Sequence, residues 1–258
     1  MCTIRKKGNI FFLTLNNDEH CLNPTLLNSI KSTLHRVRQQ ATTSSVLITT
    51  AHGKFFSNGY DIDWAQSNKS RFILIDDSLR SVVSELISLP MPTIAVVTGH
   101  ASTAGYIFAL SHDYVLMSSD HEFLYKNELD IDIDHVIPAW FVAVIDAKVG
   151  DAAAMKRIVK EAEKVTAEEA VRLGIVDSAH DSVEETVKAA VELAGDLVKR
   201  GLNGEVYAEN RKKLLGHVIG TFEDNLLGKP TSISTNGGLL VLLMLQLAQI
   251  VVSCFSPC

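Results

Sequence analysis

The stretch that decides the fold lies at residues 92–109 and reads PTIAVVTGHASTAGYIFA. Thr93 to Thr98 form a short, β-branched and apolar run with the length of a buried strand. Small residues follow it and lead into an apolar segment that predicts a helix. Small side chains at the start of a helix let a ligand approach the backbone, and they equally suit close packing of a helix on a sheet. Both interpretations stay open for this stretch taken alone.

Strand and helix signals alternate on either side of this stretch. Three further runs have strand composition and length, namely Ile10 to Leu15, Ser45 to Thr50 and Tyr114 to Ser118. Asn23-Pro24 predicts the start of a helix, because asparagine caps helices and proline suits their first position. A second helical repeat runs from Leu79 to Ile87. The alternation predicts an α/β fold with parallel βαβ units.

Beyond about Ile137 the strand signals stop, and the sequence predicts helices only. We expect them at residues 139–148, 151–163, 166–173, 182–199 and 205–215. Thr166-Ala-Glu-Glu169 has the pattern of a capping box at the third of these. We therefore expect an α/β core over residues 1–136 and a helical C-terminal part of the same domain over 137–229. Residues 230–258 contain no charge and are expected to form an apolar tail of uncertain structure.

Composition excludes several classes of protein. The chain has 258 residues, 47% of them hydrophobic, which suits one large globular domain or two small ones. A net charge of −6 gives no indication of a basic surface for nucleic acid, so no nucleic-acid partner is expected. The four cysteines, Cys2, Cys21, Cys254 and Cys258, form no CxxC pair, so neither a metal site nor a disulfide framework is expected. This pattern favours a reducing compartment, and the apolar run near the N-terminus is too short for a secretory signal.

The mean hydropathy of +0.15 is high for an enzyme, and the excess lies in the tail. The segment from Gly237 to Cys258 accounts for it, since the preceding residues average close to zero. Its apolar run is shorter than the ~20 residues that span a bilayer. Packing on the domain or on another subunit, an unfolded segment and a marginal membrane anchor are the alternatives, with membrane contact the least favoured.

Another glycine-containing loop follows a strand signal at residues 53–62, which read GKFFSNGYDI. Glycine lets the backbone turn so that the next amide, that of Tyr60, points outward. With the segment around Ala104, the chain offers two amide donors from distant positions, as a developing enolate oxygen requires. Alone, the loop around Gly59 has the composition of an ordinary turn. No phosphate-binding loop is present, because neither GKS/T nor GxGxxG occurs.

These segments together resemble the enoyl-CoA hydratase/isomerase (crotonase) superfamily, and most of all the plant peroxisomal Δ3,Δ2-enoyl-CoA isomerases. The resemblance rests on FFSNGYDI, PTIAVVTGHASTAG and SHDYVLMSSDHEFLYKNELDI and covers roughly residues 1–222. It implies a crotonase-like spiral of ββα units with a helical C-terminal part. It also implies a homo-oligomer (trimer or hexamer), an acyl-CoA substrate and no separate cofactor. Peroxisomal location is implied too, although the chain ends Ser256-Pro-Cys258 rather than in a Ser-Lys-Leu-type signal, so the cytosol is the alternative.

The resemblance also assigns roles to individual residues. The amides of Tyr60 and Ala104 would bind the thioester oxygen, and Glu128 would be the catalytic base. The CoA portion would contact Ser57, Asn58, Gly59, Tyr60, Asp61 and Gly105. Hydratases of this superfamily use two glutamates, and the first of those positions is Ile107 here. Because one carboxylate suffices to move a proton from C2 to C4, the sequence favours an isomerase over a hydratase.

Alternatives to this interpretation remain at the sequence level. They are enoyl-CoA hydration with unusual residues, thioester hydrolysis, and a catalytically silent acyl-CoA-binding subunit. His52 and His100 flank the two loops and offer other bases, although histidines at such places are more typically hydrogen-bonded loop residues. Asp130, Asp132 and Asp134 near Glu128 are expected to be solvated, and if close they would raise its pKa by like-charge repulsion.

Overall fold

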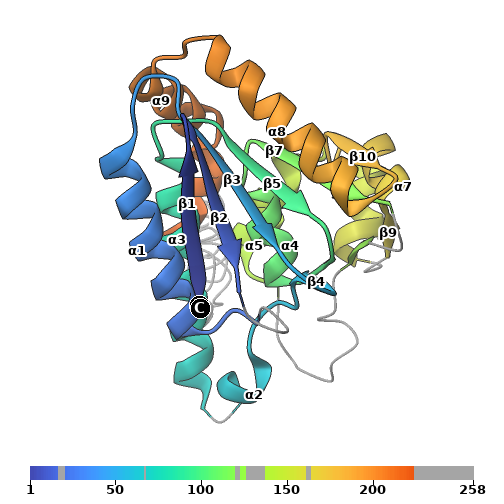
Figure 1. Ribbon diagram of the computed structural model, residues 1–258. Helices are drawn as coiled ribbons and strands as arrows, with labels where there is room; N and C mark the ends of the chain where they lie inside the picture. Colours follow the sequence, from blue (N-terminus) through green and yellow to red (C-terminus); the bar gives the residue numbers. More distant parts are fainter. Residues whose placement is uncertain (17–20, 67, 120–122, 126–136, 161–163, 224–258) are drawn as a thin grey trace, which may run out of the picture. The chain divides into compact units, whose positions relative to one another are not determined.

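A six-stranded sheet forms the centre of the unit made by residues 1–223 in the computed structural model (Figure 1). The residues described are 1–16, 21–66, 68–119, 123–125, 137–160 and 164–223. Glu128, the aspartates after it and the apolar tail lie outside them, as do the predicted domain boundaries at residues 136 and 229. In spatial order the strands are β1 (Cys2–Lys7), β2 (Ile10–Leu15), β3 (Val46–Ala51), β5 (Thr93–Val97), β7 (Tyr114–Ser118) and β10 (Ser178–His180).

Parallel pairing runs through this sheet from β2 to β10, and only β1 is antiparallel to its neighbour. The helices are α1 (Pro24–Gln40), α2 (Ile62–Ala65), α3 (Lys69–Ile87), α4 (Ala104–Leu110), α5 (Ala139–Asp146), α6 (Ala152–Met155), α7 (Ala167–Arg172), α8 (Val183–Lys199), α9 (Gly204–Leu214) and α10 (Gly216–Gly220). A π-helical turn follows α6 at Lys156–Lys160, and a 3₁₀ turn ends the described chain at Thr221–Glu223. The predicted α/β class with parallel pairing is confirmed.

Local sequence explains where several helices begin. The Asn23 side chain accepts a hydrogen bond from the Leu26 amide, with proline next to it at the first helical position of α1. Thr166 caps α7 by accepting from the Glu169 amide, as the capping-box pattern predicts. Gly174 follows the end of α7 with a φ of +73°, a conformation that glycine adopts without strain.

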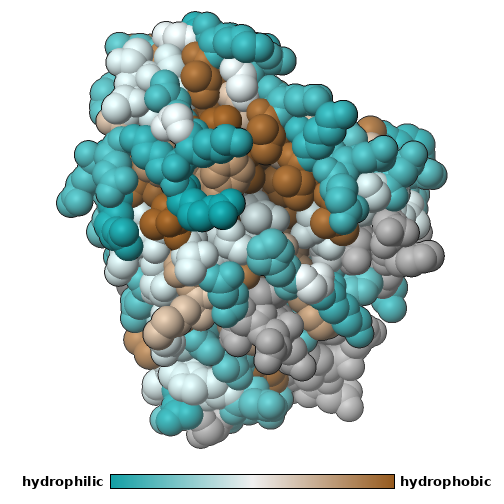
Figure 2. Space-filling model, in the orientation of Figure 1, coloured by the Kyte–Doolittle hydropathy of each residue, from teal (hydrophilic) through white to brown (hydrophobic). Residues whose placement is uncertain are grey.

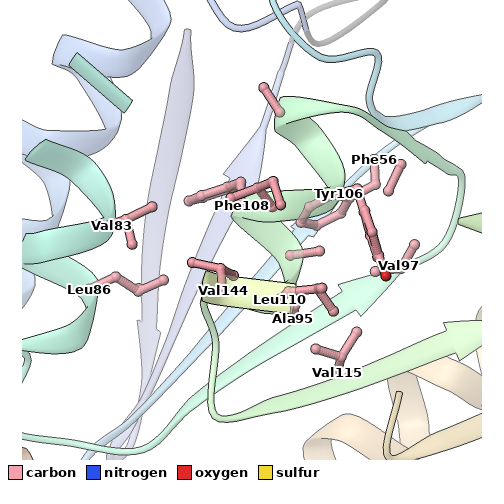
Figure 3. Packing of buried hydrophobic residues seen from close by; sticks show 14 of the residues in the cluster. Phe56, Val83, Leu86, Ala95, Val97, Tyr106, Phe108, Leu110, Val115 and Val144 are labelled. Atoms are coloured by element: carbon pink, nitrogen blue, oxygen red, sulfur yellow. The ribbon is translucent and has the colours of Figure 1, made fainter. Parts of the chain in front are cut away.

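The two faces of the sheet carry separate apolar clusters, because side chains alternate along a strand. On one face, Val46, Ile94 and Val96 pack against Ala190 and Ala194 of α8. Figure 2 shows this face, where apolar surface gathers along α8 and the strands beside it. The opposite face carries the larger core, closed by α1, α3, α4 and α5. In Figure 3, side chains of this core from β5, β7, α3 and α5 converge on α4.

A second sheet of four short strands lies beside the first. Its order is β4 (Phe55–Ser57), β6 (His100–Ser102), β8 (Phe123–Tyr125) and β9 (Val165–Thr166). The first three strands are mutually parallel, and β9 is antiparallel to β8. This sheet matters for function because β4 and β6 lead into the two predicted loops.

The prediction that strands stop at Ile137 is wrong, because β9 and β10 lie beyond it. Both are very short, and β10 reads Ser-Ala-His, a sequence without strand propensity. It becomes a strand by pairing with β7 along Leu116 to Ser118, so tertiary contact overrides local preference. The helix expected over 151–163 is also shorter, since α6 gives way to the π-helical turn after Met155.

Candidate active site

The second sheet brings the two predicted loops together. Strands β4 and β6 are parallel neighbours, with Phe55 opposite His100 and Ser57 opposite Ala101. The carboxyl ends of parallel strands lie at the same edge of a sheet, so the segments that leave them are adjacent. The first loop, Asn58–Asp61, leaves β4. The second loop is the short segment around Thr103 that joins β6 to α4, which begins two residues after β6. Segments more than forty residues apart in the chain thus meet at one place.

Gly59 lies against the segment that precedes α4. Its φ is +85°, and a Cβ added there would lie 3.0 Å from the carbonyl oxygen of Ser102 and 3.2 Å from Cβ of Thr103. The amide nitrogen of Ala104 would be 3.7 Å away. Only glycine combines this backbone conformation with so close an approach. The residue before Tyr60 and the amide of Ala104 are therefore in near contact.

Gly105 makes the reciprocal approach to the first loop. A Cβ at this position would lie 2.5 Å from the carbonyl oxygen of Ser57 and 2.6 Å from its Cβ. Ser57 is fully buried, so neither backbone has room to move aside. Each loop thus occupies space that a side chain on the other would need.

Hydrogen bonds fix the first loop on both sides. The Gly59 amide donates to Oγ of Ser57 over 3.3 Å, and Oγ of Ser102 lies 3.2 Å from Oδ1 of Asn58. The Gly59 carbonyl accepts from the Leu22 amide at 2.7 Å. These contacts tie the loop to β6 and to the segment before α1.

Asp61 ends this loop in a structural role. Its carboxylate accepts from the Trp64 amide at 3.0 Å and so caps α2. The other carboxylate oxygen lies 3.3 Å from Nδ2 of Asn23. Of the residues that the resemblance assigns to CoA, Ser57, Asn58 and Asp61 therefore each take part in building the loop.

Thr103 carries backbone strain at the entrance to α4. Its φ and ψ are 51° and −116°, a conformation that β-branched residues rarely adopt. Residues in sparsely populated backbone regions cluster at functional sites, where the surrounding fold holds them. The strain lies immediately before the Ala104 amide, and the second loop is thus held in a defined and costly conformation.

An apolar pocket begins at Thr103 and extends under α4. Ile107, at the position where the resemblance places the first hydratase glutamate, lines it and is only 1% exposed. The other lining residues are Tyr106, Ile137, Phe141, Ile145 and Val159. No side chain in this lining can carry a proton from water to a substrate carbon near neutral pH, since burial raises the pKa of the Tyr106 hydroxyl further.

Tyr60 anchors the first loop through its side chain, a contact the sequence did not predict. The ring is buried, and its hydroxyl donates to the carboxylate of Asp76 in α3 at 2.9 Å. Asp76 lies on the buried face of α3, four residues before Arg80. Two opposite charges one turn apart within an apolar helical repeat are the signal that could have indicated a buried polar site.

The two histidines beside the loops differ in their surroundings. His52 is exposed, whereas His100 in β6 is partly buried beside the Phe55 ring, with centroids 5.7 Å apart. Burial lowers the pKa of His100, and the charges of Lys54 and Lys164 lower it further. His100 therefore favours the neutral form, as part of the loop packing.

Glu128 lies outside the described residues, so its relation to the loops stays a prediction. The last described residues before it, Phe123–Tyr125, form β8, in which Tyr125 lies opposite Ser102 of β6. In the part of the chain that the structure describes, no group of three or more histidine, cysteine, aspartate or glutamate side chains could hold a metal ion. No helix of this part is long and apolar enough to cross a membrane.

The two loops held together at Gly59 and Gly105 lie at the edge of a small, mostly parallel sheet beside the larger sheet and its helices, and this arrangement defines a crotonase-type fold. The enoyl-CoA hydratase/isomerase family matches residues 5–211, and the chain belongs to this family. It is 53% identical over 229 residues to "Enoyl-CoA delta isomerase 1, peroxisomal" of Arabidopsis thaliana, across 86% of this chain and 95% of that relative. It is also 48% identical over 220 residues to "Enoyl-CoA delta isomerase 3" of the same plant, across 83% and 92%.

Solved structures confirm the fold at much lower identity. The apo structure of an Mtb enoyl-CoA isomerase superposes with a TM-score of 0.77 at 19% identity, covering 87% of this chain and 95% of that one. An enoyl-CoA hydratase from Mycobacterium ulcerans reaches 0.78 at 19% identity, covering 87% and 96%. Because proteins named for either reaction fit equally well, the fold alone does not select the reaction.

Proposed function

We propose that this chain is a Δ3,Δ2-enoyl-CoA isomerase, which converts 3-enoyl-CoA to trans-2-enoyl-CoA in the oxidation of unsaturated fatty acids. The observation that carries this proposal is the pairing of the two loops beside a pocket in which Ile107 replaces a carboxylate. Hydration needs two acid–base groups, whereas a double-bond shift needs one. The names of the Arabidopsis relatives support the same activity.

The reaction follows from three groups acting on one thioester. Glu128 takes a proton from C2, and the electrons of that C–H bond spread over a dienolate that ends on the thioester oxygen. The amides of Tyr60 and Ala104 hold this negative oxygen, each worth about 3 to 4 kcal/mol of barrier if lost. Glu128 then returns a proton to C4, which leaves the double bond between C2 and C3. The reaction is an internal proton shift, so no cofactor takes part; coenzyme A belongs to the substrate.

The described residues suit an acyl-CoA in this role. Apolar side chains, among them Ile107 and Phe141, line a small pocket beside the second loop, so an acyl chain packed against them would have its thioester near the loops. The Asn58–Asp61 loop is proposed to follow the CoA portion with its backbone, because several of its side chains already bond within the protein.

The direct test is turnover by the purified full chain. Wild type should convert 3-enoyl-CoA to the conjugated 2-enoyl product, and Glu128→Gln should lose this conversion while it still binds acyl-CoA. Glu209→Gln, an exposed glutamate on α9, is a matched control that should keep wild-type rates. Full activity of Glu128→Gln would refute the assigned base.

The same preparation separates the alternative functions. A 3-hydroxy product from 2-enoyl-CoA would favour hydration, and free CoA would favour thioester hydrolysis. Acyl-CoA binding without turnover of any enoyl substrate would favour a silent subunit. Each of these outcomes contradicts the proposed isomerase.

Location and assembly are also proposals. Two Arabidopsis relatives are named peroxisomal, which supports a peroxisomal enzyme, and the family resemblance supports a trimer or hexamer. Imaging of the full chain with a fluorescent protein at its N-terminus tests the first. Light scattering of the purified full chain tests the second, and a monomer would contradict it.

A further inference from the structure

The carboxylate of Asp76 is buried beneath the first oxyanion loop. Its side chain is only 1% exposed, in the middle of α3. Burying a carboxylate costs several kcal/mol unless other groups compensate for the lost water. The groups in contact with Asp76 provide this compensation.

Two hydrogen-bond donors and one cation surround this carboxylate. The Tyr60 hydroxyl lies 2.9 Å from Oδ1, and the indole Nε1 of Trp140 lies 3.1 Å from Oδ1 and 3.3 Å from Oδ2. Nε of Arg80 lies 2.9 Å from Oδ2 as an ion pair. Burial raises the pKa of Asp76 above its ordinary value, and the neighbouring charge of Asp77 adds to this; Tyr60, Arg80 and Trp140 offset only part of the rise. The carboxylate thus joins the loop to α3 and α5.

Aromatic packing immobilises the Tyr60 ring around this contact. Phe72 of α3 meets the ring edge-on with centroids 5.9 Å apart, and Phe141 of α5 lies 6.2 Å away. Trp140 in turn packs edge-on against Phe141 at 4.5 Å. Neighbouring residues of α5 therefore hold both the ring of Tyr60 and its hydrogen-bond acceptor.

The backbone amide and the side-chain hydroxyl of Tyr60 have different roles. Its backbone amide is the proposed oxyanion donor, and its phenol is anchored 16 residues away in sequence, in a helix that is part of the core. The value of an oxyanion donor depends on its placement, since a displacement of about 1 Å can cost on the order of 100-fold in rate.

We infer that Asp76 is a positioning residue for the reaction, which holds the Tyr60 amide in place through the tyrosine hydroxyl. This inference rests on the proposed function. In this inference Asp76 acts through Tyr60 and takes no part in the proton transfer itself. The fixed amide lowers the barrier without strengthening ground-state binding, so its loss appears in kcat rather than in KM.

Two variants weaken the contact from opposite ends. Tyr60→Phe removes the donor oxygen and keeps the ring between Phe72 and Phe141, whereas Asp76→Asn keeps the shape and replaces the charged acceptor by a neutral, weaker one. Each should lower kcat for 3-enoyl-CoA by about 10- to 100-fold with KM changed less than threefold. The double variant should be little worse than Tyr60→Phe alone, because both substitutions act on the same contact. Tyr60→Phe carries the test even if Asp76→Asn folds poorly.

Glu85→Gln is the matched control on the same helix. Glu85 also accepts from an arginine, Arg38, but faces α1 rather than the loop. Its variant should lose some stability and keep wild-type kcat. Wild-type kcat in folded Tyr60→Phe and Asp76→Asn would overturn the inference, as would losses that vanish when rates are normalised to the folded fraction.

A second readout separates this inference from the proposed function. Amide hydrogen exchange over residues 58–61 should be faster in Tyr60→Phe and in Asp76→Asn than in wild type and Glu85→Gln, whatever reaction the protein catalyses. Unchanged exchange in both variants would refute the positioning role. An inactive wild type with faster exchange in the variants would refute the isomerase while leaving the anchoring of the loop in place.

Discussion

Gly59 approaches Ala104 so closely that a Cβ added to the glycine would lie 3.7 Å from the alanine amide nitrogen, although the two residues belong to different strand–loop units. This approach sets the spacing of the two proposed oxyanion donors, because Tyr60 follows Gly59 directly. It also makes the site sensitive to a single added carbon atom.

Gly59→Ala should reduce kcat/KM for 3-enoyl-CoA by about 100-fold. The added methyl group would meet the Ser102 carbonyl at 3.0 Å in a backbone conformation that alanine rarely adopts, so one loop must shift. Steady-state kinetics checks this. Gly195→Ala in α8 is the control, since a Cβ there meets nothing within 4 Å. The control should keep activity and gain about 0.5 to 1 kcal/mol of stability; equal kinetics in both variants would contradict the prediction.

Arg211→Met should lower the free energy of unfolding by about 3 to 5 kcal/mol, because it leaves buried acceptors and a carboxylate without their donor. The Arg211 side chain on α9 donates to the Asp113 carboxylate at 2.6 Å and to the carbonyls of Ile87 and Met91 at 2.7 and 3.2 Å. Urea unfolding measures the loss. The stability of Arg211→Lys should lie between those of wild type and Arg211→Met, since lysine keeps the charge without the guanidinium fork. A loss below about 1 kcal/mol for Arg211→Met would disprove the role of this contact.

His112 should make the protein sensitive to mild acid. Complete burial lowers its pKa to about 3, with Nδ1 facing the Phe108 carbonyl and Nε2 facing the Thr49 hydroxyl. Below the ordinary histidine pKa of about 6.5, His112 is protonated in the unfolded chain but stays neutral in the folded chain. Stability therefore falls as the pH falls from 6.5 towards 3.

The expected slope is about 1.4 kcal/mol for each pH unit in that window. Urea unfolding at several pH values, compared between wild type and His112→Gln, isolates it. The variant should show a shallower dependence by about one proton, whatever its absolute stability. Parallel curves would mean that His112 does not titrate differently in the folded state.

Thr166→Ala should cost about 1 kcal/mol of stability, since it removes the side-chain oxygen that caps α7. Thr166→Ser keeps that oxygen and should restore most of the loss. Thermal unfolding of the three proteins distinguishes a lost cap from lost packing of the threonine methyl group, because in the latter case serine would resemble alanine.

Features encoded within a few residues were predictable from the sequence. Asn23 and Thr166 cap the helices that they were expected to cap, and β2 and β7 have the predicted bounds. Both loops at Gly59 and Ala104 were marked by small residues after strands. The two loops are adjacent because β4 pairs with β6, and strands of three residues are too short to give a sequence signal for that pairing.

Features that depend on distant partners were not predictable. β10 exists because β7 offers it a free edge, and Asp76 is tolerated in the core because Tyr60 and Trp140 reach it from other elements. Local propensity carries no information about such partners. The role proposed for Glu128 rests on family resemblance, because the local sequence carries no physical signal that marks it as a base.

The mutual fit of Gly59 with Ser102 and of Gly105 with Ser57 has an evolutionary consequence. A bulkier residue in either segment needs a compensating change in the other, so single steps away from the present pair are penalised. The sequences of the two loops should therefore change together in evolution. New acyl-CoA chemistries on this framework would then arise more readily around the pocket beneath α4 than between the loops themselves.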